Sequence, residues 1–246
     1  VNIDPDTGKV IPALATEWTV SADGCVYEFT IDKDATFTDG TPCTAEDVKY
    51  TYDKAKTSSF ASQKVADVIA TEVIDSTHIR ITLQKANQDW LTLMAHGGTS
   101  ILSKAACEKD RVNGPRLGSG MFSLEEWVPG SHCSFVRYDG YRKGAAPTRR
   151  IVMKLYKEAS TRLIALQTGE IDVCIDPSTT DLERIKADAN LDLIQTPNVV
   201  MLYMPMQMEK KGLDNVHVRK ALAYAMDKES IVFAAYDGLA TVHNNY

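Results

Sequence analysis

The first half of the chain carries the alternating pattern of half-buried β-strands. Residues 26–31 (VYEFTI) alternate large apolar and polar side chains, which is the two-residue period of a strand with one buried face. The turn-forming run SADG at 21–24 separates this strand from a second apolar run at 17–20, so the pattern predicts a β-hairpin. A second pair of strands is predicted within residues 72–83, around a turn at 75–77. Further strands are predicted over 10–14, 121–127, 133–138 and 151–156.

Helical signals lie between these strands. Thr44 can cap a helix and Asp47 can reciprocate, and acidic residues in the first turn complement the positive end of the helix dipole. The spacing predicts a helix over 44–56, with Val48 and Tyr52 on its apolar face. Shorter helices are predicted over 61–70, 88–94 and 102–109.

The second half of the chain alternates between helical and strand-like runs. Helices are predicted over 160–168, with Gly169 at the usual C-terminal position, and over 180–187. The longest helical pattern covers 216–235, with a break near Asp227. Strands are predicted over 171–175, 191–195 and 199–206. This alternation, which starts at Ile151, is typical of α/β units on a mixed sheet, whereas the first hundred residues are typical of an α+β fold.

A change of composition marks the predicted domain boundary. Residues 114–120 hold one proline and three glycines, as interdomain segments often do. We therefore expect an α+β domain over residues 1–115 and an α/β domain over residues 116–246.

Composition narrows the possible partners. The chain has 246 residues with 27 basic and 33 acidic side chains, a formal charge of -6, and this balance argues against a nucleic-acid partner. No apolar run approaches the ~20 residues that a membrane helix needs. The chain begins at Val1 without a start methionine or a signal peptide, so we expect it to be a piece of a longer protein.

The residues that carry catalysis or bind metals do not form known patterns. The five cysteines include no C-x-x-C pair, and no histidine pairs with another ligand at metal-binding spacing. The chain also lacks H-E-x-x-H, G-x-S-x-G and P-loop motifs. We therefore expect no enzyme activity, no metal site and no cofactor.

Two segments are candidates for the wall of a binding cleft. The run HGGTS at 96–100 could expose backbone donors, although a plain connector explains it equally well. The methionine-rich run at 201–208 suits an adaptable pocket wall, and it suits a protein core equally well.

Several runs together resemble one family, the extracytoplasmic solute-binding proteins of family 5, which serve peptide, nickel and related ABC importers. The runs occur in the family's order along nearly the whole chain. One departure is the run YDGYR at 138–142, where the family usually has Asn-Pro-Asp-Tyr-Trp. The matching runs are ALATEW (13–18), SADG (21–24), YEF (27–29), FTDGTP (37–42), TAEDV (44–48), LGSGMF (117–122), WVPG (127–130), LQTGEIDV (166–173) and VHVRKALAYAMD (216–227).

The resemblance implies part of a type II periplasmic-binding-protein-like fold. Members of the family have two lobes that close over the ligand. By this resemblance, residues 1–115 would be the extra subdomain of the family, and residues 116–246 a partial lobe I that ends near the hinge. The first strands of lobe I and the whole second lobe would be missing.

The resemblance also implies a function. The parent protein would be the extracytoplasmic substrate-binding component of an ABC importer for oligopeptides, dipeptides, nickel or other small solutes. It would be a monomer, either periplasmic or a cell-surface lipoprotein, and would deliver its ligand to a membrane permease. A peptide-sensing or regulatory protein of the same family is the alternative. By position, the cleft-lining residues would be His96, Gly97, Thr99, Ser100, Met121, Phe122 and Tyr203, without catalytic roles.

Overall fold

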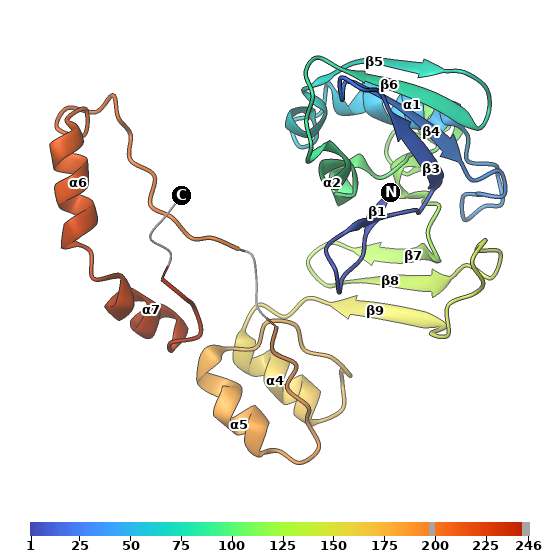
Figure 1. Cartoon of the computed structure of the whole chain (residues 1–246). Helices are drawn as coiled ribbons and strands as arrows, with labels where there is room; N and C mark the ends of the chain where they lie inside the picture. Colours follow the sequence, from blue (N-terminus) through green and yellow to red (C-terminus); the bar gives the residue numbers. More distant parts are fainter. Residues whose placement is uncertain (197–199, 243–246) are drawn as a thin grey trace. The chain divides into compact units, whose positions relative to one another are not determined.

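The chain forms two compact units, which are described separately below. The computed structural model describes residues 1–196 and 200–242 (Figure 1). Unit 1 comprises Val1–Leu155 and unit 2 comprises Tyr156–Tyr246.

A four-stranded antiparallel sheet forms the main layer of unit 1. Its strand order is β3-β4-β6-β5, so β4 and β6 occupy the centre of the sheet. The inward side chains of the central strands are almost fully buried, as Ile79 and Ile81 of β6 show. Both predicted hairpins are confirmed, because β3 pairs with β4 and β5 pairs with β6. The strands are β3 (Ala15–Val20), β4 (Val26–Ile31), β5 (Val68–Val73) and β6 (His78–Leu83).

The predicted N-terminal helix is α1 (Ala45–Ala55), and it packs against this sheet (Figure 1). Asp47 holds its start, because its Oδ2 accepts hydrogen bonds from the backbone N–H of Thr44 (2.9 Å) and from the hydroxyl of Thr44 (3.0 Å). Val48 and Tyr52 belong to the main hydrophobic core of unit 1, as their spacing predicts.

Unit 1 also contains short helical elements and a separate two-stranded sheet of β1 and β2. The helix predicted over 61–70 is wrong, because the chain makes only one 3-10 turn before β5 begins at Val68. The β-branched side chains of β5 pair with β6, and this long-range pairing overrides the local helical signal. The remaining elements are β1 (Asn2–Ile3), β2 (Val10–Ile11), η1 (Ser62–Val65), α2 (Trp90–Met94), η2 (Gly97–Thr99), α3 (Lys104–Lys109) and η3 (Gly114–Arg116).

A second sheet of unit 1 has the antiparallel order β7-β8-β9. Hydrogen bonds connect it to the first part of the chain. The N–H of Thr38 donates to the carbonyl of Gly118 (2.9 Å), and the hydroxyls of Thr36 and Tyr138 lie 3.1 Å apart. The predicted boundary at 115/116 therefore falls between the two sheets and inside one compact unit. The strands are β7 (Phe122–Val128), β8 (His132–Arg137) and β9 (Arg150–Lys154).

The described residues of unit 2 contain helices and no strand. The predicted break near Asp227 is confirmed, because α6 ends at Ala225 and Asp227 caps α7 by accepting from the N–H of Ser230 (3.0 Å). Gly169 has a φ of 73° directly after α4, as expected of a helix end. The elements are α4 (Ala159–Gln167), η4 (Thr179–Asp181), α5 (Leu182–Ala187), α6 (Val216–Ala225) and α7 (Lys228–Tyr236).

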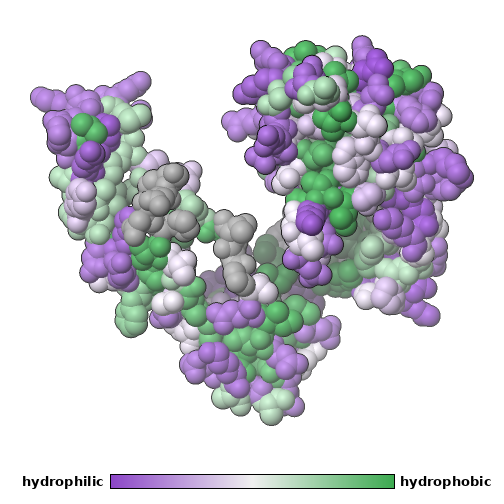
Figure 2. All heavy atoms as spheres, in the orientation of Figure 1, coloured by the Kyte–Doolittle hydropathy of each residue, from purple (hydrophilic) through white to green (hydrophobic). Residues whose placement is uncertain are grey.

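The three strands predicted in unit 2 are not formed in the described residues. Residues 171–175, 191–195 and 200–206 are irregular, and residue 199 lies outside the described residues. A strand is stable only when a neighbouring strand satisfies its backbone groups, and unit 2 offers none in the residues described. Apolar side chains of these runs therefore face solvent, with Ile194 87% exposed. Figure 2 shows hydrophobic side chains at the surface of the segment that carries α4 and α5.

Candidate functional site

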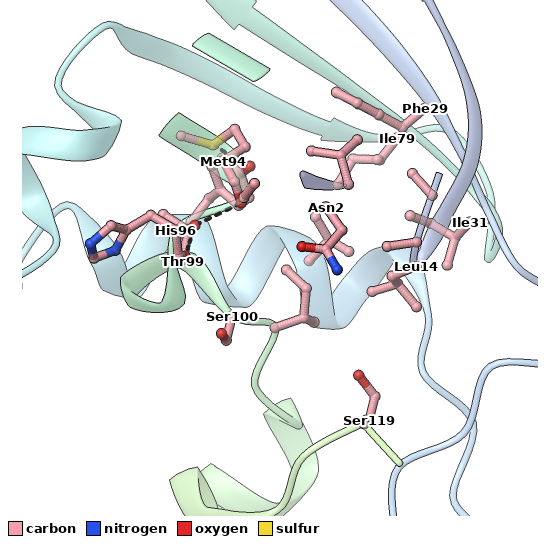
Figure 3. A pocket seen from close by; sticks show the side chains of 18 of the residues that line it. Asn2, Leu14, Phe29, Ile31, Ile79, Met94, His96, Thr99, Ser100 and Ser119 are labelled. Carbon is pink, nitrogen blue, oxygen red and sulfur yellow. Dashed lines mark hydrogen bonds between the residues drawn. The ribbon is translucent and has the colours of Figure 1, made fainter. Parts of the chain in front are cut away.

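A cavity of about 370 Å³ lies within unit 1. Residues from β1, from the inner face of the main sheet, from α1 and from the segment that follows α2 form its walls, and Ser119 and Gly120 contribute from the chain before β7. Figure 3 shows how side chains from these distant segments converge on one space. The volume lies in the lower part of the range typical of small-molecule pockets, ~300–1,000 Å³.

The inner wall of the cavity is apolar. Leu14, Phe29, Ile31 and Ile79 contribute hydrocarbon surface, and Met94 adds a thioether (Figure 3). Such a wall favours an apolar group of a ligand, because burying that group removes its surface from water.

One hydroxyl of this wall is held neutral. The phenol of Tyr52 donates a hydrogen bond to the sulfur of Met94 (2.7 Å), and burial raises the pKa of Tyr52 well above its ordinary value. This phenol therefore contributes packing, and does not serve as a base at neutral pH.

Small uncharged groups form one part of the polar lining. Asn2, Ser100 and Ser119 line the cavity, and each is labelled in Figure 3. Within the described part of the chain, no side-chain hydrogen bond engages the hydroxyls of Ser100 and Ser119. These two hydroxyls are therefore able to donate to, or accept from, a bound group.

The segment 96–100 forms a tight turn beside the cavity. Nδ1 of His96 accepts a hydrogen bond from the N–H of Gly98 (3.0 Å), and the imidazole points away from the cavity (Figure 3). The hydroxyl of Thr99 is shared between the carbonyls of Met94 (2.9 Å) and His96 (2.7 Å). Three of the residues predicted from this run line the cavity. Of these three, Ser100 alone offers the cavity a side chain that makes no hydrogen bond within the described residues.

The cavity brings together some of the predicted site residues. His96, Thr99 and Ser100 line it, whereas Gly97 belongs to the same turn without lining it. Met121 and Phe122 directly follow the lining residue Gly120 and do not line the cavity themselves. Tyr203 belongs to unit 2 and is 68% exposed. Contact of all seven residues with a solute stays a prediction.

Sequence reasoning missed Arg142, a charged residue of the lining. Its side chain is only 8% exposed, and its Nε lies 2.7 Å from Oδ2 of Asp32. Its Nη2 donates a hydrogen bond to the carbonyl of Ala13 (2.7 Å), and its guanidinium lies 5.3 Å from the ring centroid of Tyr141. The one sequence signal that could have found it is the departure of the run 138–142 from the pattern usual in the resembled family.

One arrangement in unit 1 resembles a catalytic triad. The hydroxyl of Ser131 lies 3.0 Å from Nδ1 of His132, and Nε2 of that ring lies 3.1 Å from a carboxylate oxygen of Glu126. All three residues lie on the β7–β8 hairpin, and the Glu126 carboxylate is mostly exposed. A solvent-exposed carboxylate interacts only weakly with an imidazole. The three residues therefore have the distances of a catalytic triad but lack the buried environment of one.

The buried thiol of Cys43 and the possible metal ligands of the described residues do not form a reactive site. Burial raises the pKa of the Cys43 thiol to about 12, so this thiol is protonated at neutral pH. Among the residues that the structure describes, no group of three or more His, Cys, Asp and Glu side chains could hold a metal ion. No helix in the described ranges is long and apolar enough to cross a membrane.

The described sheets and helices enclose a largely apolar cavity of a size that a small ligand could occupy. The sequence profile of the bacterial extracellular solute-binding proteins, family 5 Middle, matches residues 9–246. The chain therefore belongs to the family 5 bacterial extracellular solute-binding proteins. This family consists of substrate-binding proteins, and the mixed α+β class predicted for the chain is confirmed.

Individual relatives bind different solutes. The chain is 29% identical to the heme-binding protein A of Haemophilus influenzae, over 95% of this chain and 48% of that protein. It is 27% identical to the dipeptide-binding protein of Escherichia coli, over 97% of this chain and 50% of that protein. The crystal structure of NikZ from Campylobacter jejuni in complex with Ni(L-His) superposes with a TM-score of 0.83 at 25% identity, over 99% of this chain and 50% of that one.

These matches cover only part of each relative. The chain spans about half the length of the curated relatives it matches.

Proposed function

We propose that this chain is part of the extracytoplasmic substrate-binding component of an ABC importer. The parent protein would bind an oligopeptide, a dipeptide or another small solute and deliver it to a membrane permease, without catalysing a reaction. Membership of the family over residues 9–246 is the observation that carries this proposal.

The cavity supports a peptide more than a metal ion. Its inner wall is hydrocarbon and its polar lining includes the hydroxyls of Ser100 and Ser119, which suits an apolar side chain beside a peptide backbone. No carboxylate or thiol is among the described residues that line it, and the imidazole of His96 points away from the cavity, although all three groups bind metal ions well (Figure 3). Within the range of solutes that the relatives bind, dipeptides and oligopeptides fit this wall best.

Transport would follow from closure over the solute. A ligand that binds the closed state better than the open state shifts the population toward the closed state. A permease that recognises only the closed state would then receive only loaded binding protein.

Calorimetric titration of the full-length protein tests the binding step. Apolar dipeptides, a nickel–histidine complex and heme form the panel, and we expect binding of dipeptides at micromolar concentrations or below. Absence of heat with every member would contradict the proposed function. Binding of nickel–histidine or heme alone would keep the binding role and exclude the peptide assignment.

A transport assay separates the two roles open to such a protein. Cells that lack the gene should lose uptake of the bound dipeptide, and the wild-type gene should restore it. Unchanged uptake together with tight binding would favour a peptide-sensing or regulatory protein of the same family.

Location and assembly are further parts of the proposal. We place the parent protein outside the cytoplasm, either in the periplasm or as a lipid-anchored surface protein, and we expect a monomer. Cell fractionation followed by detergent extraction distinguishes the two locations, and light scattering after size-exclusion chromatography measures the mass. We also propose that residues 1–115 form the family's extra subdomain and residues 116–246 part of lobe I.

A further inference from the structure

We propose that Arg142 forms a carboxylate-binding position in the cavity of unit 1, so that this wall recognises the anionic end of an apolar solute. This inference rests on the proposed binding function and names the part of the solute that the cavity takes.

The charge of the lining has one sign. Arg142 is a lining residue, and no aspartate or glutamate is among the described residues that line the cavity. An ammonium group or a metal cation would therefore meet no opposite charge there, whereas a carboxylate would meet a guanidinium.

Arg142 has hydrogen-bond donors that the protein does not use. A guanidinium carries five N–H groups. One Nη2 N–H donates to the carbonyl of Ala13 (2.7 Å). The Nε is fully buried and forms an ion pair with Asp32, 2.7 Å from a carboxylate oxygen, so it is not open to a ligand. Within the described residues, no acceptor engages Nη1.

Unused donors of this kind favour an additional acceptor. A bound carboxylate would form charge-assisted hydrogen bonds with the N–H groups of Nη1. The Arg142 side chain is also held in place by Asp32, Ala13 and the ring of Tyr141, so little side-chain freedom remains to be lost on binding.

Asp32 determines the expected strength of the position. It lies at the guanidinium and partly neutralises the positive charge, so a bound carboxylate would meet repulsion from Asp32 as well as attraction from Arg142. Removal of the Asp32 charge should therefore strengthen carboxylate binding, which gives the proposal a second and opposite prediction.

The rest of the lining defines the solute class. Ser100 and Ser119 offer hydroxyl donors, and Leu14 and Met94 belong to the apolar wall. The solute group that fits is a carboxylate attached to a hydrocarbon side chain, as at the C-terminal residue of an apolar peptide.

The test compares an acid with its amide in the full-length protein. N-acetyl-methionyl-leucine and its C-terminal amide differ in the carboxylate and share every apolar group, and calorimetry gives the ratio of their dissociation constants. We expect wild-type protein to prefer the acid by about tenfold or more, since a charge-assisted hydrogen bond contributes ~1.5–3 kcal/mol.

Three variants locate the effect. Arg142→Gln should reduce the acid-to-amide ratio to about one, Asp32→Asn should raise it above the wild-type ratio, and Arg137→Gln should leave it unchanged. Arg137 is the matched control, because its Nε pairs with Asp139 (2.7 Å) and it does not line the cavity.

The outcomes separate this inference from the proposed function. A wild-type protein that binds both peptides without preference, or an Arg142→Gln variant that keeps the preference, overturns the carboxylate position and leaves peptide binding intact. If Arg142→Gln fails to fold, the Asp32→Asn ratio decides, and a ratio that stays at or falls below wild type overturns the position. Absence of binding by either peptide contradicts the carboxylate position, and the wider solute panel then decides the proposed function.

Discussion

The two units of the chain differ sharply in how they bury their apolar residues. Both hydrophobic clusters lie in unit 1, where strands, helix and aromatic side chains enclose one another. Among the described residues of unit 2 the buried hydrophobic side chains are few, namely Leu163, Ala165 and Ile185. Long apolar side chains such as Tyr224 and Phe233 instead face solvent there. The helix α1 of unit 1 is therefore packed against a core, whereas the described helices of unit 2 bury few apolar side chains.

The difference shows that an apolar pattern requires a partner surface before it forms a core. In unit 1 the two surfaces that pack together belong to the same unit, because the strands β4 and β6 and the helix α1 all lie within it. The apolar runs of unit 2 have no such partner among the described residues of that unit itself. The chain spans about half the length of its relatives. We expect polypeptide corresponding to the other half of the relatives to cover these side chains.

The largest effect is expected from Trp90→Ala in unit 1. Trp90 is 0% exposed, and its ring centroid lies 4.5 Å from that of Tyr27 and 6.0 Å from that of Phe29. Removal of the ring should lower the free energy of unfolding of unit 1 by about 3–5 kcal/mol. Urea denaturation followed by circular dichroism measures this change.

Trp127→Ala is the control for this prediction. Trp127 is also in unit 1, but it is exposed at the β7 strand. Its replacement should cost less than ~1 kcal/mol, as surface substitutions usually do. Equal costs for the two tryptophans would contradict the claim that unit 1 has a specific core.

A smaller absolute effect is expected from Leu163→Ala in unit 2. Leu163 is almost fully buried in α4, and its loss should cost about 2–3 kcal/mol, toward the lower end for buried leucines because exposed neighbours can collapse into the space. Amide hydrogen exchange in α4 and α5 measures this cost locally. The neighbour Ile164 is 53% exposed, and Ile164→Ala should leave exchange nearly unchanged. Similar effects of both variants would indicate that unit 2 has no core of its own.

The parts of the structure that sequence could predict are those with local causes. The turn at 21–24 and the start of α1 at Thr44 depend on neighbours within a few residues, and both are confirmed. The break between α6 and α7 is also local, since Asp227 caps the second helix itself.

The parts that sequence missed depend on distant partners. Residues 191–195 have the composition of a strand, but no strand in the described part of unit 2 pairs with them. The 61–70 segment was misassigned because its pairing with β6 is not visible in its own sequence. Arg142 was missed for the same reason, because its contact with Asp32 joins segments far apart in the chain.

A moderate effect is expected from Asp47→Ala, which tests how unit 1 is held together. One carboxylate oxygen accepts from Thr44, and the other accepts from the N–H of Lys104 at the start of α3 (2.9 Å). Removal of these partly buried acceptors should cost about 1–3 kcal/mol in urea denaturation. Asp53→Asn on the same helix removes only an exposed ion pair with Lys49 and should cost at most ~0.5 kcal/mol.

The smallest effect is a pH dependence that distinguishes the units. Hydrogen bonds from the backbone of Thr77 and from the side chain of His78 hold the pKa of Asp75 in unit 1 below its usual range. Hydrogen bonds from the side chain and backbone of Ser230 likewise lower the pKa of Asp227 in unit 2. A carboxyl with a lowered pKa in the folded state stabilises that state at neutral pH. This stabilisation is lost as the pH falls below the usual value of about 4.

Two variants assign this dependence to the units. Asp75→Asn should flatten the loss of protection in β5 and β6 between pH 5 and pH 3, and Asp227→Asn should do so in α7 alone. Amide hydrogen exchange at each pH, corrected for the intrinsic exchange rate, measures both. Because both carboxylates are exposed, we expect small effects confined to the local element. An Asp227→Asn change that altered exchange in β5 and β6 would contradict the local origin of this pH dependence.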